Sequence, residues 1–154
     1  QPIEGLSPPQ LALFALVQYL VGNTDWSAAS AAEGNRCCHN VAILGAQNDQ
    51  WNTPLPYDFD HAGLVNAPYA SPDRQLPIRS VTQRWYRGLC ESNDSISAAI
   101  AIFNEKRPEL DKLFNDDNLP DPNARKRALK YIDAFYETIN DPIQVEKRIL
   151  SSCR

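Results

Sequence analysis

The stretch Ser7-Pro-Pro-Gln-Leu-Ala-Leu-Phe-Ala-Leu-Val-Gln-Tyr-Leu-Val-Gly22 predicts a helix at the centre of the fold. Ser7 is typical of an N-cap and Pro8 of the first helical position, and Gly22 is a common C-terminal breaker. The apolar side chains cover nearly the whole circumference of this helix: Leu11, Phe14, Leu16, Val17, Tyr19, Leu20 and Val21. Because a helix that is apolar all round belongs inside a core, we expect this one to be buried.

A polar loop, Asn23-Thr-Asp-Trp-Ser27, follows this helix directly. Loops at such positions often carry functional residues, which makes Asp25 a candidate. Helix capping is the alternative explanation, because Asn and Asp also suit helix ends. Residues 28–36 are small and polar and predict an irregular excursion, from which the chain returns at Cys37-Cys-His-Asn40. For His39 we expect a structural role, with its ring bonded to a backbone carbonyl.

Two short extended runs come next and predict a β-hairpin. Val41–Leu44 is typical of a buried strand, a turn-rich linker follows, and Trp51–Tyr57 supplies the second arm. Antiparallel arms bring Asn40, at the start of one arm, close to Asp58, at the end of the other. Because Asp25 lies in the loop just before, we expect these three polar residues to converge.

Asp58 and Asp60 flank a single aromatic residue, Phe59. On an extended strand side chains alternate, so both carboxylates would lie on one face and Phe59 on the other. Two such carboxylates repel each other unless a cation lies between them, and Mg²⁺ commonly takes one or two carboxylates plus substrate phosphates. The alternative is that the strand ends here in a turn, where Asp and the following Gly63 are common.

The C-terminal half predicts a helical bundle. Helices are expected to begin near Val81, Asp94, Pro108, Pro122 and Pro142, the last two after an Asp that suits the N-cap. For Arg84 and Arg87 we expect solvation or pairing with nearby acids, and phosphate binding is the alternative. Together with the hairpin, the pattern predicts a mainly α fold with a small β-hairpin, in a single domain spanning residues 1–154.

Composition narrows the classes of function. The 154 residues are 43% hydrophobic and 22% charged, which is typical of a globular domain. The formal net charge of −4 and the pI near 5.1 do not support a nucleic-acid-binding surface. No apolar run reaches the roughly 18 residues of a membrane span.

The four cysteines predict a disulfide-bonded, exported protein: Cys37, Cys38, Cys90 and Cys153. Neighbouring cysteines rarely bond to each other, so we expect two long-range bridges and a secreted or periplasmic location. A zinc site is the weaker alternative, because the Cys-x-x-Cys spacing is missing. The chain begins with Gln1 and contains no methionine, which predicts a processed form or fragment of a longer chain.

Taken in order, three motifs resemble the C-terminal lobe of atypical protein kinases: Gly22-Asn-Thr-Asp-Trp-Ser27, His39-Asn40 and Tyr57-Asp-Phe-Asp60. The HipA-like and spore-coat CotH-like groups have a Gly-Asn-x-Asp catalytic loop, a later Asn and an acidic metal motif. The Pro-Tyr-Asp-Phe-Asp run, with the Gly63–Ala70 stretch after it, also resembles bacterial secreted proteins of that architecture. The resemblance covers about Ser7 to Arg87.

The resemblance implies a metal-dependent, ATP-binding phosphotransferase with a kinase-like C-lobe. Asp25 would be the catalytic base that orients the hydroxyl of an unidentified acceptor. Asn40 and Asp58 would hold Mg²⁺ or Mn²⁺ and, through the metal, the ATP phosphates, with Asp60 as a further metal ligand. A kinase also needs an N-terminal lobe. No strand-rich segment with a phosphate-contacting lysine precedes Ser7, so we expect that lobe in a longer parent chain.

The sequence also departs from the HipA-like pattern, which places a His two residues after the Asp and an Asn a few residues further on. Here Trp26-Ser27 and a long insertion come before Asn40. One alternative is a non-catalytic, secreted binding or scaffold domain that derives from a kinase-like fold and is stabilised by disulfides. Another is a metal-dependent hydrolase that uses the same acids, although the chain lacks a His-rich ligand set.

Overall fold

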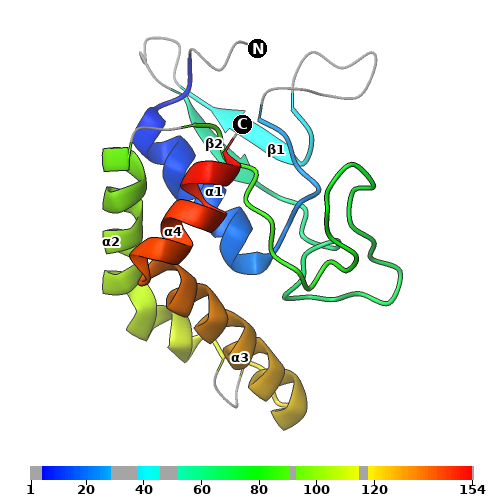
Figure 1. Cartoon of the computed structure of the whole chain (residues 1–154). Helices are drawn as coiled ribbons and strands as arrows, with labels where there is room; N and C mark the ends of the chain where they lie inside the picture. Colours follow the sequence, from blue (N-terminus) through cyan, green and yellow to red (C-terminus); the bar gives the residue numbers. More distant parts are fainter. Residues whose placement is uncertain (1–4, 29–37, 46–51, 91–92, 115–117, 154) are drawn as a thin grey trace.

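The computed structural model describes residues 5–28, 38–45, 52–90, 93–114 and 118–153 (Figure 1). The elements are, in order, α1 (Pro8–Val21), β1 (Val41–Leu44), β2 (Thr53–Pro56), α2 (Asn93–Lys112), α3 (Pro122–Ile139), α4 (Pro142–Arg148) and the short 3₁₀ turn η2 (Leu150–Ser152). The predicted class, mainly α with a small β-hairpin, is confirmed. Within the described residues, no helix is both long and apolar enough to cross a bilayer.

Helix α1 has the predicted boundaries and the predicted burial. Ser7 occupies the N-cap with extended backbone, although its side chain makes no capping hydrogen bond. Gly22 ends the helix in the left-handed region at φ 68°. A side chain at Gly22 would also overlap the hydroxyl of Tyr131. Both the left-handed backbone conformation and the space beside Tyr131 therefore favour glycine at this position. A stripe of Leu13, Val17 and Val21 is partly exposed. The buried residues cover most of the circumference of the helix: Leu11, Ala12, Phe14, Ala15, Leu16, Gln18, Tyr19 and Leu20.

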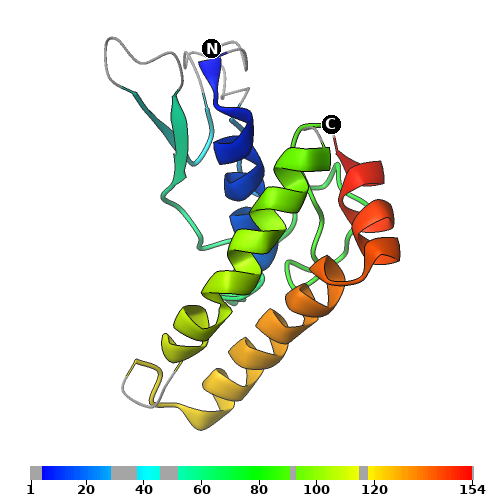
Figure 2. The ribbon, with the colours of Figure 1, turned by 90° about the vertical axis from the view of Figure 1, so that its left-hand side faces the viewer.

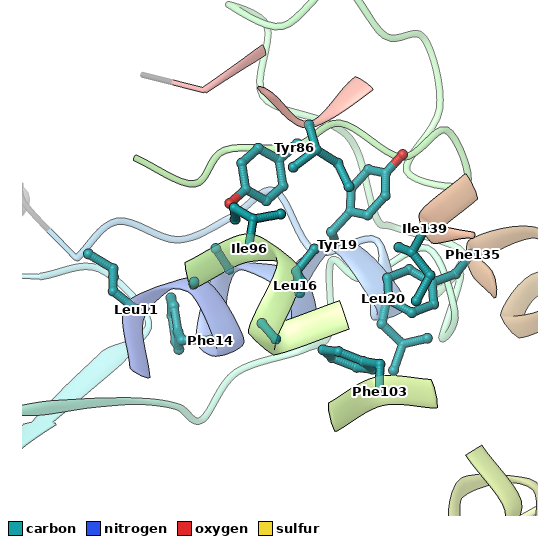
Figure 3. Close-up of a cluster of buried hydrophobic side chains, with 14 of the residues drawn as sticks. Leu11, Phe14, Leu16, Tyr19, Leu20, Tyr86, Ile96, Phe103, Phe135 and Ile139 are labelled. Atoms are coloured by element: carbon teal, nitrogen blue, oxygen red, sulfur yellow. The ribbon is translucent and has the colours of Figure 1, made fainter. Parts of the chain in front are cut away.

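The core forms where α2 and α3 pack against α1. In Figure 2, α2 and α3 run side by side in opposite directions, and α2 also lies along α1. Figure 3 shows that side chains from all three helices meet, with the Phe135 ring centroid 5.1 Å from that of Phe103 and 6.0 Å from that of Tyr19. The N-caps of α3 and α4 are Asp121 and Asp141, as predicted, and each carboxylate accepts backbone N–H bonds.

The two arms of the hairpin pair antiparallel, as predicted, but the second arm is shorter than expected. Val41 pairs with Pro56 and Leu44 with Thr53. Strand β2 ends at Pro56, so the Asp58-Phe-Asp60 run does not lie on a strand. The prediction that strand alternation places both carboxylates on one face is therefore wrong, and the alternative, a strand that ends in a turn, is correct.

Two predicted helices differ from the structure. Residues 81–90 are irregular, and the long segment between β2 and α2 runs along the opposite side of α1 from α2 (Figure 1). Val81 and Tyr86 are buried there without helical spacing, because the arginines of this segment bind backbone carbonyls of other elements, as described below. Pro108 does not start a helix but lies inside α2, which continues to Lys112. An ion pair between Arg107 and Asp133 of α3 ties the helix to its neighbour at this point.

A disulfide joins Cys90, just before α2, to Cys153 near the C-terminus, 63 residues apart in sequence. This bridge confirms that the chain is disulfide-bonded. It leaves Cys37 and Cys38 as each other's only remaining partners within the chain, so the prediction of two long-range bridges is wrong. The reason is tertiary: the C-terminal turn after α4 packs back against the residues that precede α2. Cys37 lies outside the described residues.

We predict that the Cys90→Ala/Cys153→Ala double variant unfolds with a free energy about 2–4 kcal/mol lower than the wild type, because the bridge no longer restricts the unfolded chain. Urea unfolding monitored by circular dichroism measures this difference. A non-reducing peptide digest checks the pairing itself, and the pairing is wrong if the Cys90 peptide is not linked to the Cys153 peptide.

We also predict that Leu16→Ala lowers the free energy of unfolding by about 2–5 kcal/mol, because Leu16 is 0% exposed and its removal leaves a cavity. The matched control is Leu113→Ala, whose side chain is 58% exposed and for which we expect a change within about 0.5 kcal/mol. Equal shifts of the urea midpoint for the two variants would contradict a core centred on α1.

Candidate functional site

The end of α1 and the start of β1 bring Asp25 and Asn40 into contact. The side-chain amide of Asn40 donates to the backbone carbonyl of Asp25 at 2.8 Å and to its carboxylate Oδ2 at 3.1 Å. Asn40 adopts a left-handed backbone conformation with φ 54°, which Asn tolerates better than most residues. The predicted meeting of these two residues is therefore present in the structure.

His39 also reaches the carboxylate of Asp25. Its Nε2 lies 2.8 Å from Asp25 Oδ1, and about half of each side chain is exposed. The prediction of a backbone partner for this ring is wrong. The reason is the local pairing of the chain, since Ser27 and His39 exchange backbone hydrogen bonds of 3.0 and 2.9 Å. This bridge places His39 directly beside the loop that carries Asp25.

Asn23 connects Asp25 to the segment that carries Asp58. The Asn23 side chain is buried, its Oδ1 accepts the backbone N–H of Asp25 at 2.9 Å, and its Nδ2 donates to the backbone carbonyl of Asp58 at 2.9 Å. The sequence placed this Asn in the Gly-Asn-x-Asp motif and suggested helix capping for it, but assigned it no role in the site. The sequence feature that could have identified Asn23 is a carboxamide side chain directly after Gly22, the C-cap of the most buried helix.

A local turn sets the arrangement of the acidic pair. Asp58 Oδ1 accepts the backbone N–H of Asp60 at 3.2 Å, which makes an Asx-type turn. The carboxylate of Asp60 lies 3.9 Å from Nε2 of His61. Further along, Gly63 donates its N–H to the Gly22 carbonyl at 3.1 Å, so this loop is anchored to the end of α1. Asp58 and Asp60 therefore belong to one turn that lies against the loop of Asp25.

Arg84 holds the C-terminal end of α1 in place. Its guanidinium donates to the carbonyls of Tyr19 at 3.0 Å, Leu20 at 3.1 Å and Tyr131 at 2.5 Å, and it stacks 3.6 Å from the centroid of the Tyr131 ring. A cation at this end of a helix also complements the helix dipole. Burial lowers the pKa of Arg84 from its ordinary value, and the neighbouring tyrosines partly offset this effect. The expectation that Arg84 is solvated or paired with acids is wrong.

Arg87 extends the same support to the site. Its Nη1 donates to the backbone carbonyl of Thr24, the residue before Asp25, and lies 3.4 Å from the carboxylate of Asp73. Pairing with an acid was expected for Arg87, whereas its bond to the site loop was not. Arg84 and Arg87 thus use their guanidinium groups on backbone carbonyls, which does not favour the alternative of phosphate binding.

The donor atoms of the site suit a hard divalent cation. The amide nitrogen of Asn40 is bound to Asp25, and no donor among the described residues bonds to its Oδ1. That oxygen and the carboxylate oxygens of Asp58 and Asp60 are ligands of the kind that Mg²⁺ prefers. The described residues contain no group of three or more His, Cys, Asp or Glu side chains arranged to hold a metal. A metal ion bound by Asp58 and Asp60 would therefore need further ligands, from Asn40 and from a substrate.

Comparisons with known proteins assign no family, because no protein-family model, curated protein or solved structure matches this chain. The chemistry of the site therefore rests on its own residues.

We predict that Arg84→Met lowers the free energy of unfolding by about 1.5–3 kcal/mol, because it removes the charged donor of hydrogen bonds to three backbone carbonyls. The matched control, Arg79→Met, removes an exposed guanidinium and should change stability by less than about 0.5 kcal/mol. Urea titration followed by tryptophan fluorescence measures both. If the two variants lose the same stability, Arg84 does not anchor α1.

Proposed function

We propose that the residues around the end of α1 form the catalytic half of a metal-dependent phosphotransferase, which transfers the γ-phosphoryl group of ATP to a hydroxyl acceptor. The observation that carries this proposal is the contact of Asn40 with Asp25, in a site that Asn23 links to Asp58. A carboxylate with one neighbouring amide and a second acidic segment is the part of a phosphoryl-transfer site that holds the acceptor hydroxyl and the metal.

Each residue has a distinct role in this proposal. Asp25 accepts a hydrogen bond from the acceptor hydroxyl and takes its proton late in transfer, as the new oxygen–phosphorus bond forms and the bond to the ADP oxygen breaks. His39 and Asn40 hold the Asp25 carboxylate from two sides. The oxygens of Asn40, Asp58 and Asp60 are available for Mg²⁺ or Mn²⁺. When bound, the metal would neutralise charge on the phosphate oxygens.

The proposed setting is an oxidising compartment, secreted or periplasmic. The Cys90–Cys153 bridge supports this setting, because stable disulfides are rare in the reducing cytosol. We also propose that an N-terminal lobe from a longer parent chain covers the nucleotide, as the resemblance to atypical kinases implies. A non-catalytic scaffold domain would share the disulfide, so the two functions are separated only by ligand binding.

We predict that Mn²⁺ with ATP raises the melting temperature of this chain, and that Asp58→Asn abolishes the rise. At about 100 times its dissociation constant a ligand stabilises the folded state by roughly 2.7 kcal/mol. The Asn side chain keeps the acceptor for the Asp60 N–H, so the variant removes the charge without removing the turn. Differential scanning fluorimetry measures the shift, with metal alone and ATP alone as separate samples.

The matched control is Asp94→Asn, which makes the same change at an exposed position in the first turn of α2 and should leave the response intact. A response of equal size in Asp58→Asn would remove the metal role of Asp58. No response in the wild type would favour the scaffold domain instead.

A further inference from the structure

We propose that Asn23 is the positioning residue of this site, and that its side chain holds the Asp58 segment at the correct distance from Asp25. The inference rests on the proposed function and adds a residue that the kinase resemblance did not assign to a role. It follows from the position of Asn23 between the two halves of the site, with Asp25, His39 and Asn40 on one side and the Asp58–Asp60 turn on the other.

Both polar atoms of the Asn23 carboxamide make hydrogen bonds. The residue is 1% exposed, its oxygen accepts from the Asp25 N–H, and its nitrogen donates to the Asp58 carbonyl. The two backbone groups are a donor and an acceptor in a partly buried setting, and only a side chain with both functions can pair the two at once. An Asp at this position would keep the first bond and direct a carboxylate oxygen at the Asp58 carbonyl, where both atoms are acceptors.

The backbone of Asn23 is itself rigidly held. Its N–H donates to the Gln18 carbonyl at 2.9 Å, and its carbonyl accepts the indole N–H of Trp26 at 3.2 Å. Trp26 is 5% exposed and packs edge-on against Phe14 of α1, with 4.9 Å between ring centroids. Asn23 therefore extends the rigidity of α1 to the turn that carries Asp58.

No other side chain in the described part of the chain bonds to both Asp25 and the Asp58–Asp60 turn. The backbone bond from Gly63 to Gly22 anchors the same loop, but five residues beyond Asp58. The pairing of Pro56 with Val41 holds the chain two residues before Asp58, so Asn23 is the side chain that ties Asp58 itself to Asp25. Partners that orient the ligands of a metal typically change metal affinity 10–100-fold when they are replaced.

The experiment compares Asn23→Asp, Asn23→Ala and the wild type by calorimetric titration with Mn²⁺ alone, below the melting temperature of each protein. We expect the affinity for Mn²⁺ to fall about 10–100-fold in both variants. The matched control is Asn104→Asp, which removes an amide donor to Asn140 on the exposed surface of α2 and should leave the affinity unchanged. Unchanged affinity in both folded Asn23 variants would overturn the proposal.

Amide hydrogen exchange gives a second readout that requires no metal. The Asp60 N–H, which is held by Asp58, should exchange about fivefold faster in both variants, the factor expected for one ordinary hydrogen bond. The Asp25 N–H should exchange faster in Asn23→Ala only, because Asp keeps its acceptor. If the wild type binds no Mn²⁺, the metal role in the proposed function fails. The positioning of Asp58 by Asn23 is then decided by this exchange, and unchanged exchange at Asp60 would overturn it.

Discussion

The C-terminal end of α1 is the constraint on which the rest of the structure depends. The last carbonyls of a helix lack the usual intrahelical partners, and here the partly buried guanidinium of Arg84 donates to those of Tyr19 and Leu20 and to the carbonyl of Tyr131 in α3. Gly22 then turns the chain in a conformation that other residues adopt poorly. Three distant parts of the chain, α1, residues 81–90 and α3, are joined at this one point.

The candidate site lies directly beyond that junction. Asn23 and Asp25 leave the end of α1, Arg87 bonds to the carbonyl of Thr24 between them, and the Asp58–Asp60 loop returns to pair with Gly22. The polar residues are thus held by a buried helix end, although they lie in loops. This arrangement suits catalysis or metal binding, both of which need precise placement of oxygen atoms on a rigid support.

Prediction from sequence succeeded where short-range chemistry decides the structure. The limits of α1, the antiparallel hairpin and the Asp-Pro starts of α3 and α4 follow from patterns within a few residues. The expected meeting of Asp25 and Asn40 is also present, and the backbone pairing of Ser27 with His39 produces it. Prediction failed at residues 81–90, because apolar spacing typical of a helix was overridden by the bonds that Arg84 and Arg87 make to distant carbonyls. Prediction failed again for His39, because the backbone pairing of His39 with Ser27 places its ring beside the Asp25 carboxylate.

The sequence by itself determined the buried helix, the polar loop behind it and the hairpin, because propensity, capping and side-chain periodicity act locally. Only the tertiary structure decided the Cys90–Cys153 pairing, the continuation of α2 through Pro108 and the link from Asn23 to Asp58. Each of these joins segments far apart in the chain or depends on packing against another element. Their energies come from contacts that exist only after the helices have packed, so no local pattern encodes them.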